Sequence, residues 1–275
     1  MEGSPVTHPS LSFDRAADFY DATRALPPDV SALLTDAILA ELGSAGRLLE
    51  VGVGTGRISR PLMERGLHVV GVDIAPRMMK QLRAQLTSAH TPPDLLLADA
   101  TWLPFREASF PALLFVHVLH LIPDWHDAVA EMRRVLAPGG VVLSHWDQTK
   151  GANWGEPSKA SDWDAAGEWW KEALHERGFQ RRKRANIQDI DAALACTGGE
   201  TRLMTIARRE EVSTVAEEME LTRNRIHSWN WEIPDDLYAE LLPRHERWAL
   251  DHFGGPDAKL RRAVEYKLQV WRFPG

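Results

Sequence analysis

The chain alternates short, strongly apolar runs with longer stretches in which apolar residues recur every three or four positions. Apolar runs bounded by turn residues are typical of buried strands, and the wider spacing is typical of amphipathic helices. The run at 111–117 is apolar almost throughout, as expected for a strand that is covered on both faces. The sequence therefore predicts strands at about 47–52, 68–72, 94–98, 111–117 and 141–146, and helices at about 56–65 and 125–136, with a further helix opening near Met78 and Met79.

Beyond residue 146 the pattern changes, because residues 147–162 are rich in Gly, Ser, Asn and Asp. Such a composition indicates a loop. Near the amino terminus, residues 13–24 have a helical spacing, and Pro27 with Pro28 breaks that helix. The rest of the sequence predicts helices at about 163–178, 187–196, 214–228 and 235–253, and strands at about 201–209 and 262–272.

Three glycines, Gly52, Gly54 and Gly56, join the first predicted strand to the helix that follows it. Glycine has no Cβ atom and adopts positive φ angles readily, so such a turn lets a ligand come close to the backbone. A nucleotide-like ligand can therefore lie across the carboxyl end of this strand.

Two ligand classes use such a turn, and the neighbouring residues separate them. A dinucleotide-binding turn has the spacing G-x-G-x-x-G. Here Arg57 stands in the place of the third glycine. Glu50, at the end of the strand, would repel a pyrophosphate but could accept a hydrogen bond from an ammonium group. The turn therefore favours a ligand with an amino-acid tail over a dinucleotide.

The segment 49–56 resembles motif I of the class I S-adenosylmethionine-dependent methyltransferases, of the small-molecule (type 11) kind. The segments 68–73, 95–100 and 134–140 resemble later parts of the same signature in the same order, so the likeness covers roughly residues 45–146. It implies a Rossmann-like α/β fold with a seven-stranded, mostly parallel sheet, an antiparallel last strand and helical lid insertions. It also implies S-adenosylmethionine as the cofactor and S-adenosylhomocysteine as its product.

On this resemblance the chain divides into a core and two insertions. We expect 1–44 to form an N-terminal helical lid with the first covering helix, 45–146 the cofactor-binding core, 147–185 a lid insertion, 186–211 a core helix with strand six, 212–258 a second lid insertion, and 259–275 the final strand. Because the sheet does not need the insertions, we expect them to wall the acceptor pocket. They contain Trp169, Trp170, Trp229 and Trp231, which either face that pocket or form the insertions' own small core.

Several residues are candidates for cofactor binding. Asp73 ends the second predicted strand 21 positions after Gly52, where an acid can accept both ribose hydroxyls. Asp99 could accept from the adenine amino group, while the amide of Ala100 could donate to a ring nitrogen. Met78 could pack on the adenine, with a core position as the alternative. The expected cofactor site further includes Glu50, Gly52, Gly54, Ile74 and His117.

Tyr20 and Arg24 stand four positions apart and so share one face of the predicted N-terminal helix. Members of the resembled family carry a similar Tyr-Asp element as a lid over the methionine end of the cofactor. The resemblance implies that Arg24 pairs with the methionine carboxylate, because a guanidinium matches both oxygens at once. An ordinary amphipathic helix with a solvated arginine is the alternative.

His117 and His120 follow the fourth predicted strand, on the side of the sheet left for a methyl acceptor. Imidazole is partly neutral near pH 7, so either residue could serve as a general base or as an orienting donor. The Asn-Pro-Pro-Tyr motif of amide methylation is absent there, and the acids of a metal-assisted mechanism are incomplete, so no metal is expected. Trp125, Trp146 and Asp147 are the further candidates for acceptor binding, although buried tryptophan is often simply core.

Composition narrows the choice of partner. The chain has 275 residues and a formal charge of −7, so it has no general attraction to a phosphate backbone and nucleic acid is disfavoured. Its single cysteine, Cys196, cannot form an intramolecular disulfide, and the sequence shows neither a signal peptide nor a membrane span. We therefore expect a cytoplasmic protein without membrane attachment, either a monomer or a homodimer.

Three functions remain open from the sequence. The first is a methyltransferase that acts on a small, partly apolar molecule at oxygen, nitrogen or carbon by in-line transfer. The second is a regulatory protein that binds S-adenosylmethionine or S-adenosylhomocysteine without turnover. The third is an RNA or tRNA methyltransferase, which the acidic balance of the chain disfavours.

Overall fold

The computed structural model describes residues 10–88, 90–149, 162–180 and 184–275. The chain divides into two compact units, which we describe separately. Unit 1 comprises residues 1–146, 184–207 and 266–275, and unit 2 comprises residues 147–183 and 208–265. Most of the loop predicted at 147–162 lies outside the described residues.

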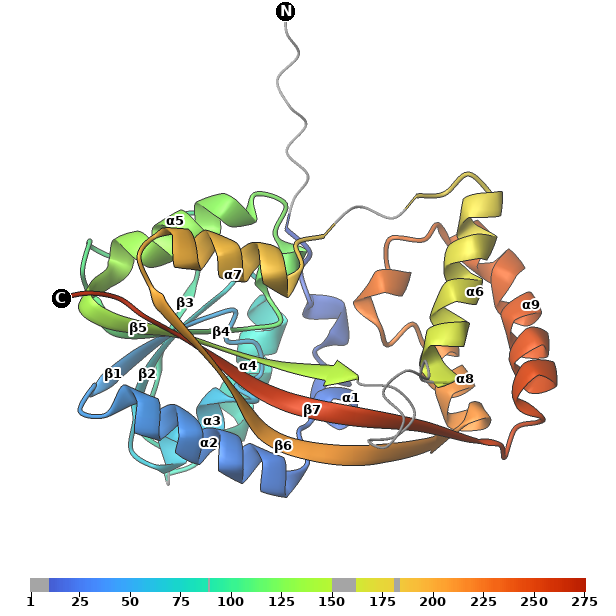
Figure 1. Ribbon diagram of the computed structural model, residues 1–275, viewed down its shortest axis with the longest axis horizontal. Helices are drawn as coiled ribbons and strands as arrows, with labels where there is room; N and C mark the ends of the chain where they lie inside the picture. The colour runs from blue at the N-terminus through green and yellow to red at the C-terminus, as the bar shows by residue number, and fades with distance from the viewer. Residues whose placement is uncertain (1–9, 89, 150–161, 181–183) are drawn as a thin grey trace, which may run out of the picture. The chain divides into compact units, whose positions relative to one another are not determined.

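A seven-stranded sheet carries the fold, with the order β3-β2-β1-β4-β5-β7-β6 (Figure 1). The five strands from β3 to β5 are parallel to their neighbours, and β7 is antiparallel. The predicted fold class is therefore confirmed. The strands are β1 (Arg47–Val51), β2 (His68–Asp73), β3 (Asp94–Leu97), β4 (Phe110–Val116), β5 (Leu136–Thr149), β6 (Glu200–Thr214) and β7 (Lys259–Arg272).

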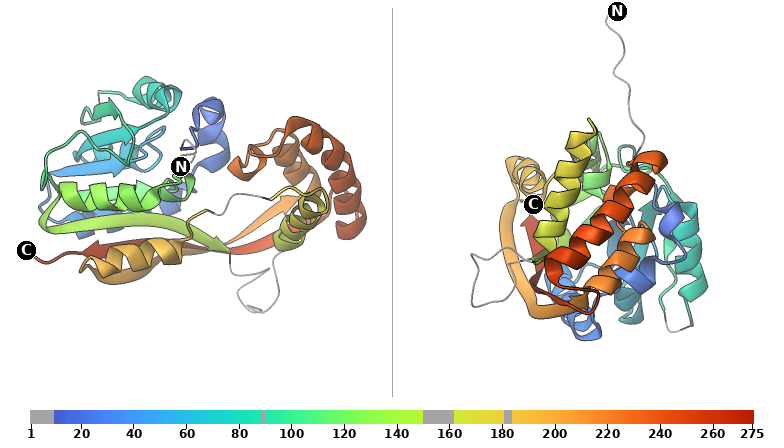
Figure 2. Two further views of the ribbon diagram at one scale, coloured as in Figure 1. Left: turned by 90° about the horizontal axis from the view of Figure 1, so that it is seen from above. Right: turned by 90° about the vertical axis from the view of Figure 1, so that its right-hand side faces the viewer.

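In unit 1, helices cover both faces of the sheet (Figure 2, left). Because side chains alternate along a strand, Leu49 and Val51 of β1 belong to one apolar core and Leu48 to the other. The first core packs against α5 (Trp125–Val135) and α7 (Ile187–Cys196). The second core packs against α2 (Pro28–Leu42), α3 (Ser59–Glu64) and α4 (Pro76–Gln85).

The strand order reverses between β1 and β4. To one side of β1 lie β2 and β3, and to the other lie β4 and β5. In open α/β sheets a crevice forms outside the carboxyl ends of the strands at such a reversal, and ligands bind there. The glycine turn after β1 and His117 after β4 both lie at this point.

Unit 2 is a small helical unit with two apolar cores. It contains α6 (Asp162–Glu176), α8 (Val215–Arg223), the 3-10 turn η3 (Ser228–Asn230) and α9 (Asp235–Phe253), together with the distal parts of β6 and β7. Trp170 and Tyr238 centre the core between α6 and α9, which cross side by side (Figure 2, right). Val215, Met219 and Ala249 centre the core between α8 and α9.

Several predicted elements differ from those found, among them the helix predicted at 214–228, which ends at Arg223, and the strand predicted at 141–146, which runs on to Thr149. The single helix predicted at 13–24 is wrong, because the segment forms η1 (Asp14–Ala16) and then α1 (Tyr20–Arg24). β5 begins at Leu136 and not at Val141, since Phe110 pairs with Leu136 and Ala112 with Val141, which leaves Ala137–Gly140 as a bulge. Gly139, with φ of 72°, accommodates that bulge.

Across the described ranges, no helix combines the length and the apolar character that crossing a lipid bilayer requires.

Glu218 gives unit 2 a testable pH dependence. It is 6% exposed, and burial raises its pKa to about 7. The folded protein therefore keeps a proton on Glu218 between about pH 4.5 and 7, whereas the unfolded chain loses it, so this residue's contribution to stability falls as pH rises through that window. We therefore compare the free energy of unfolding of Glu218→Gln with that of wild type by chemical denaturation. The difference, variant minus wild type, should increase by roughly 2–3 kcal/mol between pH 4 and pH 8.

The matched control is Glu210→Gln, which changes an exposed glutamate of the neighbouring strand β6. Its difference from wild type should stay constant with pH. A Glu218→Gln difference that is equally flat would show that the native carboxyl is ionised throughout.

Candidate functional site

In the glycine turn after β1, the first and third glycines are closely packed and the middle one is open. Gly52, Gly54 and Gly56 have φ angles of 78°, 53° and 73°. A Cβ atom on Gly52 would come within 2.7 Å of Val118, and one on Gly56 would overlap Leu82. A Cβ atom on Gly54 would meet nothing closer than the Met78 Cε at 3.4 Å. Gly54 is thus the point where a ligand can approach the backbone.

Asp73 ties this turn to the one after β2. Its Oδ2 accepts from the Gly54 amide at 2.8 Å, and its Oδ1 accepts from the Ala75 amide at 2.8 Å. Burial raises the pKa of Asp73, and the hydrogen bonds from the Ala75, Gly54 and Ile74 amides partly counter that rise. Each carboxylate oxygen has a second lone pair, so Asp73 can still accept from a ligand hydroxyl.

Glu50 is a second buried carboxyl group behind the same turn. It is 2% exposed, and its Oε2 accepts from the hydroxyl of Ser59 at the start of α3. Burial raises the pKa of Glu50 well above its usual range, and the charge of Asp73 adds to the rise, while Arg57 lowers it. A cation beside the turn would therefore be favoured, because it would offset the cost of these two buried carboxylates.

The segment from η1 to α1 is fastened to the turn by polar contacts. Asp21 accepts from the Thr55 hydroxyl at 2.5 Å and from the Gln85 amide at 2.8 Å, and it pairs with Arg60 at 3.4 Å. Arg57 donates to the backbone carbonyl of Arg24 at 2.7 Å. Further along, Arg77 contacts both Asp14 and Asp18, and its amide at the start of α4 donates to Asp14.

Tyr20 and Met78 share a small apolar cluster beside Gly54. Ala17, Ala75 and Met78 form its buried part, and Tyr20 packs against it, with its ring edge-on to Phe13 at 5.9 Å. The structure thus brings Tyr20, Met78 and the Asp73 turn together. Arg24 is half-buried at the end of α1, where its carbonyl holds Arg57.

The loop after β3 holds Asp99 at the surface. Asp99 is exposed, and its Oδ1 accepts from both the amide and the hydroxyl of Thr101, at 2.9 and 2.8 Å. Ala100 is buried. Sequence analysis did not single out Trp102, which is 83% exposed two positions further on. The available signal was a large aromatic residue three positions after Asp99.

Histidines gather at the carboxyl end of β4, where Val116 pairs with His145 of β5. His117 has a φ of 53°, an unusual conformation for a non-glycine residue that is enriched at functional sites. Its ring lies edge-on to those of His120 and His145, each with centroids 6.4 Å apart. His145 is buried, contacts the Lys267 carbonyl through Nδ1 at 2.8 Å and stacks on Tyr266.

His120 differs from an ordinary histidine. Burial lowers its pKa to about 4, helped by His117 and Arg184. It is therefore neutral near pH 7 and can donate and accept hydrogen bonds, but it is a weak base. Sequence analysis missed His145 and Tyr266, because only the pairing of distant strands brings them to His117.

The further candidates for acceptor binding come from two elements, α5 and β5. Trp125 begins α5, where it packs against the core of unit 1 and against the ring of His126. Trp146 lies under the Lys267 ammonium at 5.2 Å, and its indole nitrogen is buried without a hydrogen-bond partner among the described residues. Asp147 is exposed and belongs to unit 2.

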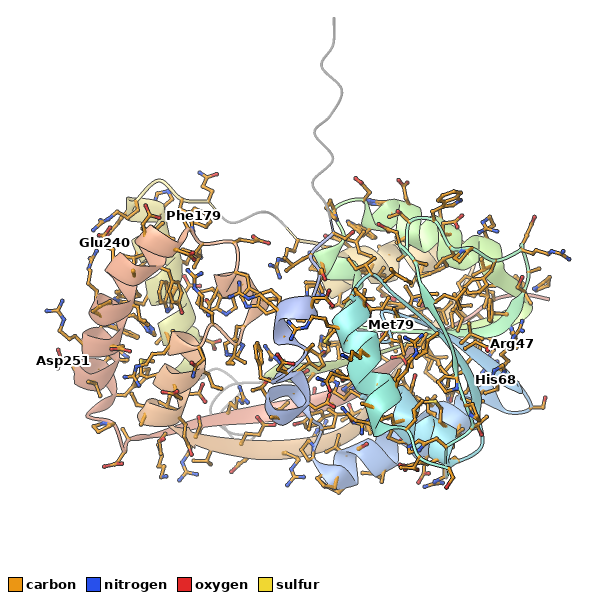
Figure 3. The ribbon with its side chains drawn as sticks, turned by 180° about the vertical axis from the view of Figure 1, so that it is seen from behind. Arg47, His68, Met79, Phe179, Glu240 and Asp251 are labelled. Carbon is orange, nitrogen blue, oxygen red and sulfur yellow. The ribbon has the colours of Figure 1, made fainter. Side chains whose placement is uncertain are left out.

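A cavity lies at the opposite edge of the sheet. Its volume is about 620 Å³, and Arg47, Asp94, Phe105 and Phe110 are among the residues that line it. Arg47 and His68, at the amino ends of β1 and β2, mark this edge in Figure 3. In the part of the chain that the structure describes, no group of three or more His, Cys, Asp and Glu is placed to hold a metal ion.

Residues 49–144 match the methyltransferase domain family. Malonyl-[acyl-carrier protein] O-methyltransferase of Serratia marcescens is 36% identical over 132 residues, which is 48% of this chain and 49% of that protein. Demethylmenaquinone methyltransferase of Thermus thermophilus is 38% identical over 110 residues, which is 38% of this chain and 50% of that protein. This chain thus spans about half the length of these curated relatives.

Among solved structures, the YcgJ protein of Bacillus subtilis superposes with a TM-score of 0.55. The alignment covers 90% of this chain and 99% of that protein at 16% identity. At that identity the likeness shows the shared fold.

The contacts of Asp21 predict how the N-terminal segment responds to mutation. Asp21→Ala removes the acceptor shared by Thr55, Gln85 and Arg60. Loosening the segment by one to two kcal/mol would raise its open population roughly 5- to 30-fold, so trypsin should cleave after Arg24 faster by about that factor. Asp36→Ala, which breaks only a surface pair with Arg65, is the matched control and should leave cleavage unchanged. Equal rates for both variants would mean that other contacts hold the segment.

Proposed function

We propose that the protein transfers a methyl group from S-adenosylmethionine to a small, partly apolar molecule. The premise is that residues 49–144 belong to a domain family of S-adenosylmethionine-dependent methyltransferases. The methyl acceptor atom is oxygen, nitrogen or carbon, and the transfer is an in-line displacement. When bound, the cofactor supplies an electrophilic methyl group on a sulfonium.

The observation that carries this proposal is the open turn at Gly54 above the half-buried Asp73 and buried Glu50 carboxyls. Of the three glycines in this turn, Gly54 has room for a ligand. Behind the turn lie two carboxyl groups whose pKa values are raised by burial. This arrangement suits a ligand that brings hydroxyls and positive charge. S-adenosylmethionine has ribose hydroxyls, an ammonium and a sulfonium. A dinucleotide brings a pyrophosphate, which these carboxylates would repel.

Each residue of the turn has a proposed part in binding. Asp73 accepts the ribose hydroxyls with the lone pairs that the backbone amides leave. Tyr20 and Met78 supply the apolar wall beside Gly54, and Asp99 with Ala100 recognises the adenine edge. Glu50 favours the ammonium group through its charge, because its Oε2 already accepts from Ser59.

At the methionine end, Arg24 pairs with the carboxylate of the cofactor. The backbone of the same residue is held by Arg57, so the pair would fasten the N-terminal segment more firmly when cofactor is bound. Ile74, which follows Asp73, completes the binding segment after β2.

The histidines after β4 handle the acceptor. His117 is the proposed general base, because it stands at the end of β4 in a strained backbone conformation that fixes its position. His120 stays neutral and orients the acceptor by hydrogen bonding, since its pKa of about 4 makes it a weak base at pH 7. Trp125 and Trp146 supply apolar surface to the acceptor, and Asp147 a polar contact.

The relatives support the class of acceptor. They are named for malonyl-[acyl-carrier protein] and for demethylmenaquinone, so their acceptors differ although the matched segment is shared. We infer that the core supplies the cofactor site and that the other segments select the acceptor. The net charge of −7 counts against an RNA acceptor.

Calorimetric titration tests cofactor binding. The protein should bind S-adenosylmethionine and S-adenosylhomocysteine and show no heat with NAD. Asp73→Ala should weaken binding by about 1.5–3 kcal/mol, which is roughly 10- to 150-fold, because it removes hydrogen bonds to a charged group. Asp94→Ala, which changes the acid at the amino end of β3 that pairs with His68, should bind as wild type does. Binding of NAD in place of S-adenosylmethionine would refute the proposal.

Transfer of a labelled methyl group tests turnover. Incubated with labelled S-adenosylmethionine and separate pools of metabolites and tRNA, the protein should label a small molecule. His117→Asn, chosen because asparagine tolerates a positive φ, should lower the rate about 10²- to 10⁴-fold even when S-adenosylmethionine is saturating. Label in tRNA would support the third function, and cofactor binding without any labelled product would support the regulatory one.

A further inference from the structure

The core of unit 2 is an aromatic cluster around a buried histidine. The ring of His245 on α9 lies 4.9 Å from that of Trp169, 5.1 Å from that of Trp170 and 5.7 Å from that of Trp248. Trp170 also stacks on Tyr238 at 5.2 Å and meets Trp229 at 5.7 Å. These residues come from α6, η3 and α9. Figure 3 labels Glu240 in the second turn of α9 and Phe179, three residues beyond the end of α6.

Polar atoms in this cluster are buried and unsatisfied. Both ring nitrogens of His245, the indole nitrogen of Trp170 and both amide atoms of Asn230 have no hydrogen-bond partner among the described residues. The three side chains are 1%, 1% and 0% exposed. An unsatisfied buried polar group costs about 1–3 kcal/mol, so five such atoms in one small core indicate that a bonding partner belongs there.

The surrounding segment is well bonded, so loose packing does not explain these atoms. The Trp231 indole donates to the Arg225 carbonyl at 2.6 Å, and Arg225 donates to the Ile233 carbonyl at 3.1 Å. Tyr238, which stacks on Trp170, donates its hydroxyl to the Thr222 carbonyl at 2.5 Å. Among the described residues of this unit, Glu218 Oε2 is the other buried side-chain atom without a partner, so most of the unpartnered atoms belong to His245, Trp170 and Asn230.

The donors and acceptors of these three residues define the missing partner. Burial lowers the pKa of His245 to about 4, so near pH 7 the ring is neutral, with one donor and one acceptor nitrogen. The Trp170 indole can only donate, and the Asn230 amide can do both. A complementary molecule is neutral, offers both acceptors and donors, and presents a flat apolar surface to the surrounding rings.

We propose that the core of unit 2 binds a neutral, planar aromatic compound bearing hydroxyl and carbonyl groups, with His245, Trp170 and Asn230 as its hydrogen-bond partners.

Charged ligands fit this cluster less well. A cation has no acceptor for the Trp170 and Asn230 donors, and the Tyr238 ring already has Trp170 stacked on it and the Arg225 guanidinium 4.0 Å from its centroid. An anion would need a positive partner, yet Arg225 is paired with Asp235 at 2.6 Å. Burial is the sole cause of the His245 pKa shift, so no charged side chain acts strongly on that ring.

A set of matched probes tests the site by calorimetry on the full chain at pH 6.5. The probe is 4-hydroxyacetophenone, which is neutral, planar and carries a hydroxyl and a carbonyl. Acetophenone lacks the hydroxyl and should bind about 3- to 10-fold more weakly, the usual effect of one hydrogen bond. Tetramethylammonium and 4-hydroxybenzoate, a cation and an anion, should not bind. Equal binding of acetophenone, or preference for either ion, would overturn the proposal.

Variants locate the site. His245→Phe and Asn230→Leu replace unsatisfied groups with apolar ones of similar size, so each should raise the melting temperature of the free protein while weakening 4-hydroxyacetophenone at least about threefold. Trp170→Phe keeps an aromatic ring and removes only the indole donor, so it should also weaken the probe. His252→Phe is the matched control, because His252 is exposed and stacks on Trp248.

The outcomes separate this proposal from the proposed function. Unchanged melting temperature and unchanged probe affinity in His245→Phe and Asn230→Leu would show that ordered water fills the cluster, and the proposal would be wrong. An equal loss of affinity in His252→Phe would place the probe elsewhere. Binding of S-adenosylmethionine should be the same in all these variants. Failure of wild type to bind that cofactor would count against the proposed function, and failure to bind the probe only against this site.

Discussion

The half-buried carboxylate of Asp73 is the constraint on which the site depends. It is held by the amides of Gly54 and Ala75, so one side chain fixes the turns after β1 and β2 relative to each other. Its cost in burial is only partly offset by those amides, as the raised pKa shows. The same charge raises the pKa of Glu50, so the two acids form one electrostatic unit behind the glycine turn. A ligand with hydroxyls and positive charge relieves both.

The N-terminal segment is an addition to this constraint. A helix of five residues such as α1 is not stable by itself, because the entropy lost in nucleating a helix exceeds the stabilisation from the hydrogen bonds of a single turn. Asp14, Asp18 and Asp21 supply the missing stability by bonding to residues of the glycine turn and of α4. The segment is therefore ordered only where the turn is, which couples the cluster of Tyr20 and Met78 to the geometry that Asp73 sets.

Local features of this chain could be predicted from the sequence and the sheet from the family resemblance, whereas particular contacts between distant residues could not. The β1 turn, Asp73 and the helices 187–196 and 235–253 follow from spacing and periodicity, and the structure has those helices at the predicted bounds. The break between η1 and α1 was missed because it depends on contacts with residues some 60 positions away, such as Asp14 with Arg77. His145 and Tyr266 were missed because β4, β5 and β7 meet only in the folded sheet. The binding and catalytic roles that the sequence suggests for the site residues stay predictions.

Two sets of buried polar groups, one behind the turn after β1 and one around His245, differ in how they are satisfied. In unit 1, Asp73 and Glu50 lie behind the turn with backbone amides and a serine hydroxyl as partners. In unit 2, His245, Trp170 and Asn230 are buried among aromatic rings without such partners. A charged group must be satisfied within the fold, because leaving it bare would cost far more than leaving a neutral one. Neutral groups can be left unsatisfied until a ligand binds, because the hydrogen bonds to the ligand then offset the free-energy cost of their burial. The polarity of each unit thus matches a different ligand, a charged and hydroxylated one in unit 1 and a neutral aromatic one in unit 2.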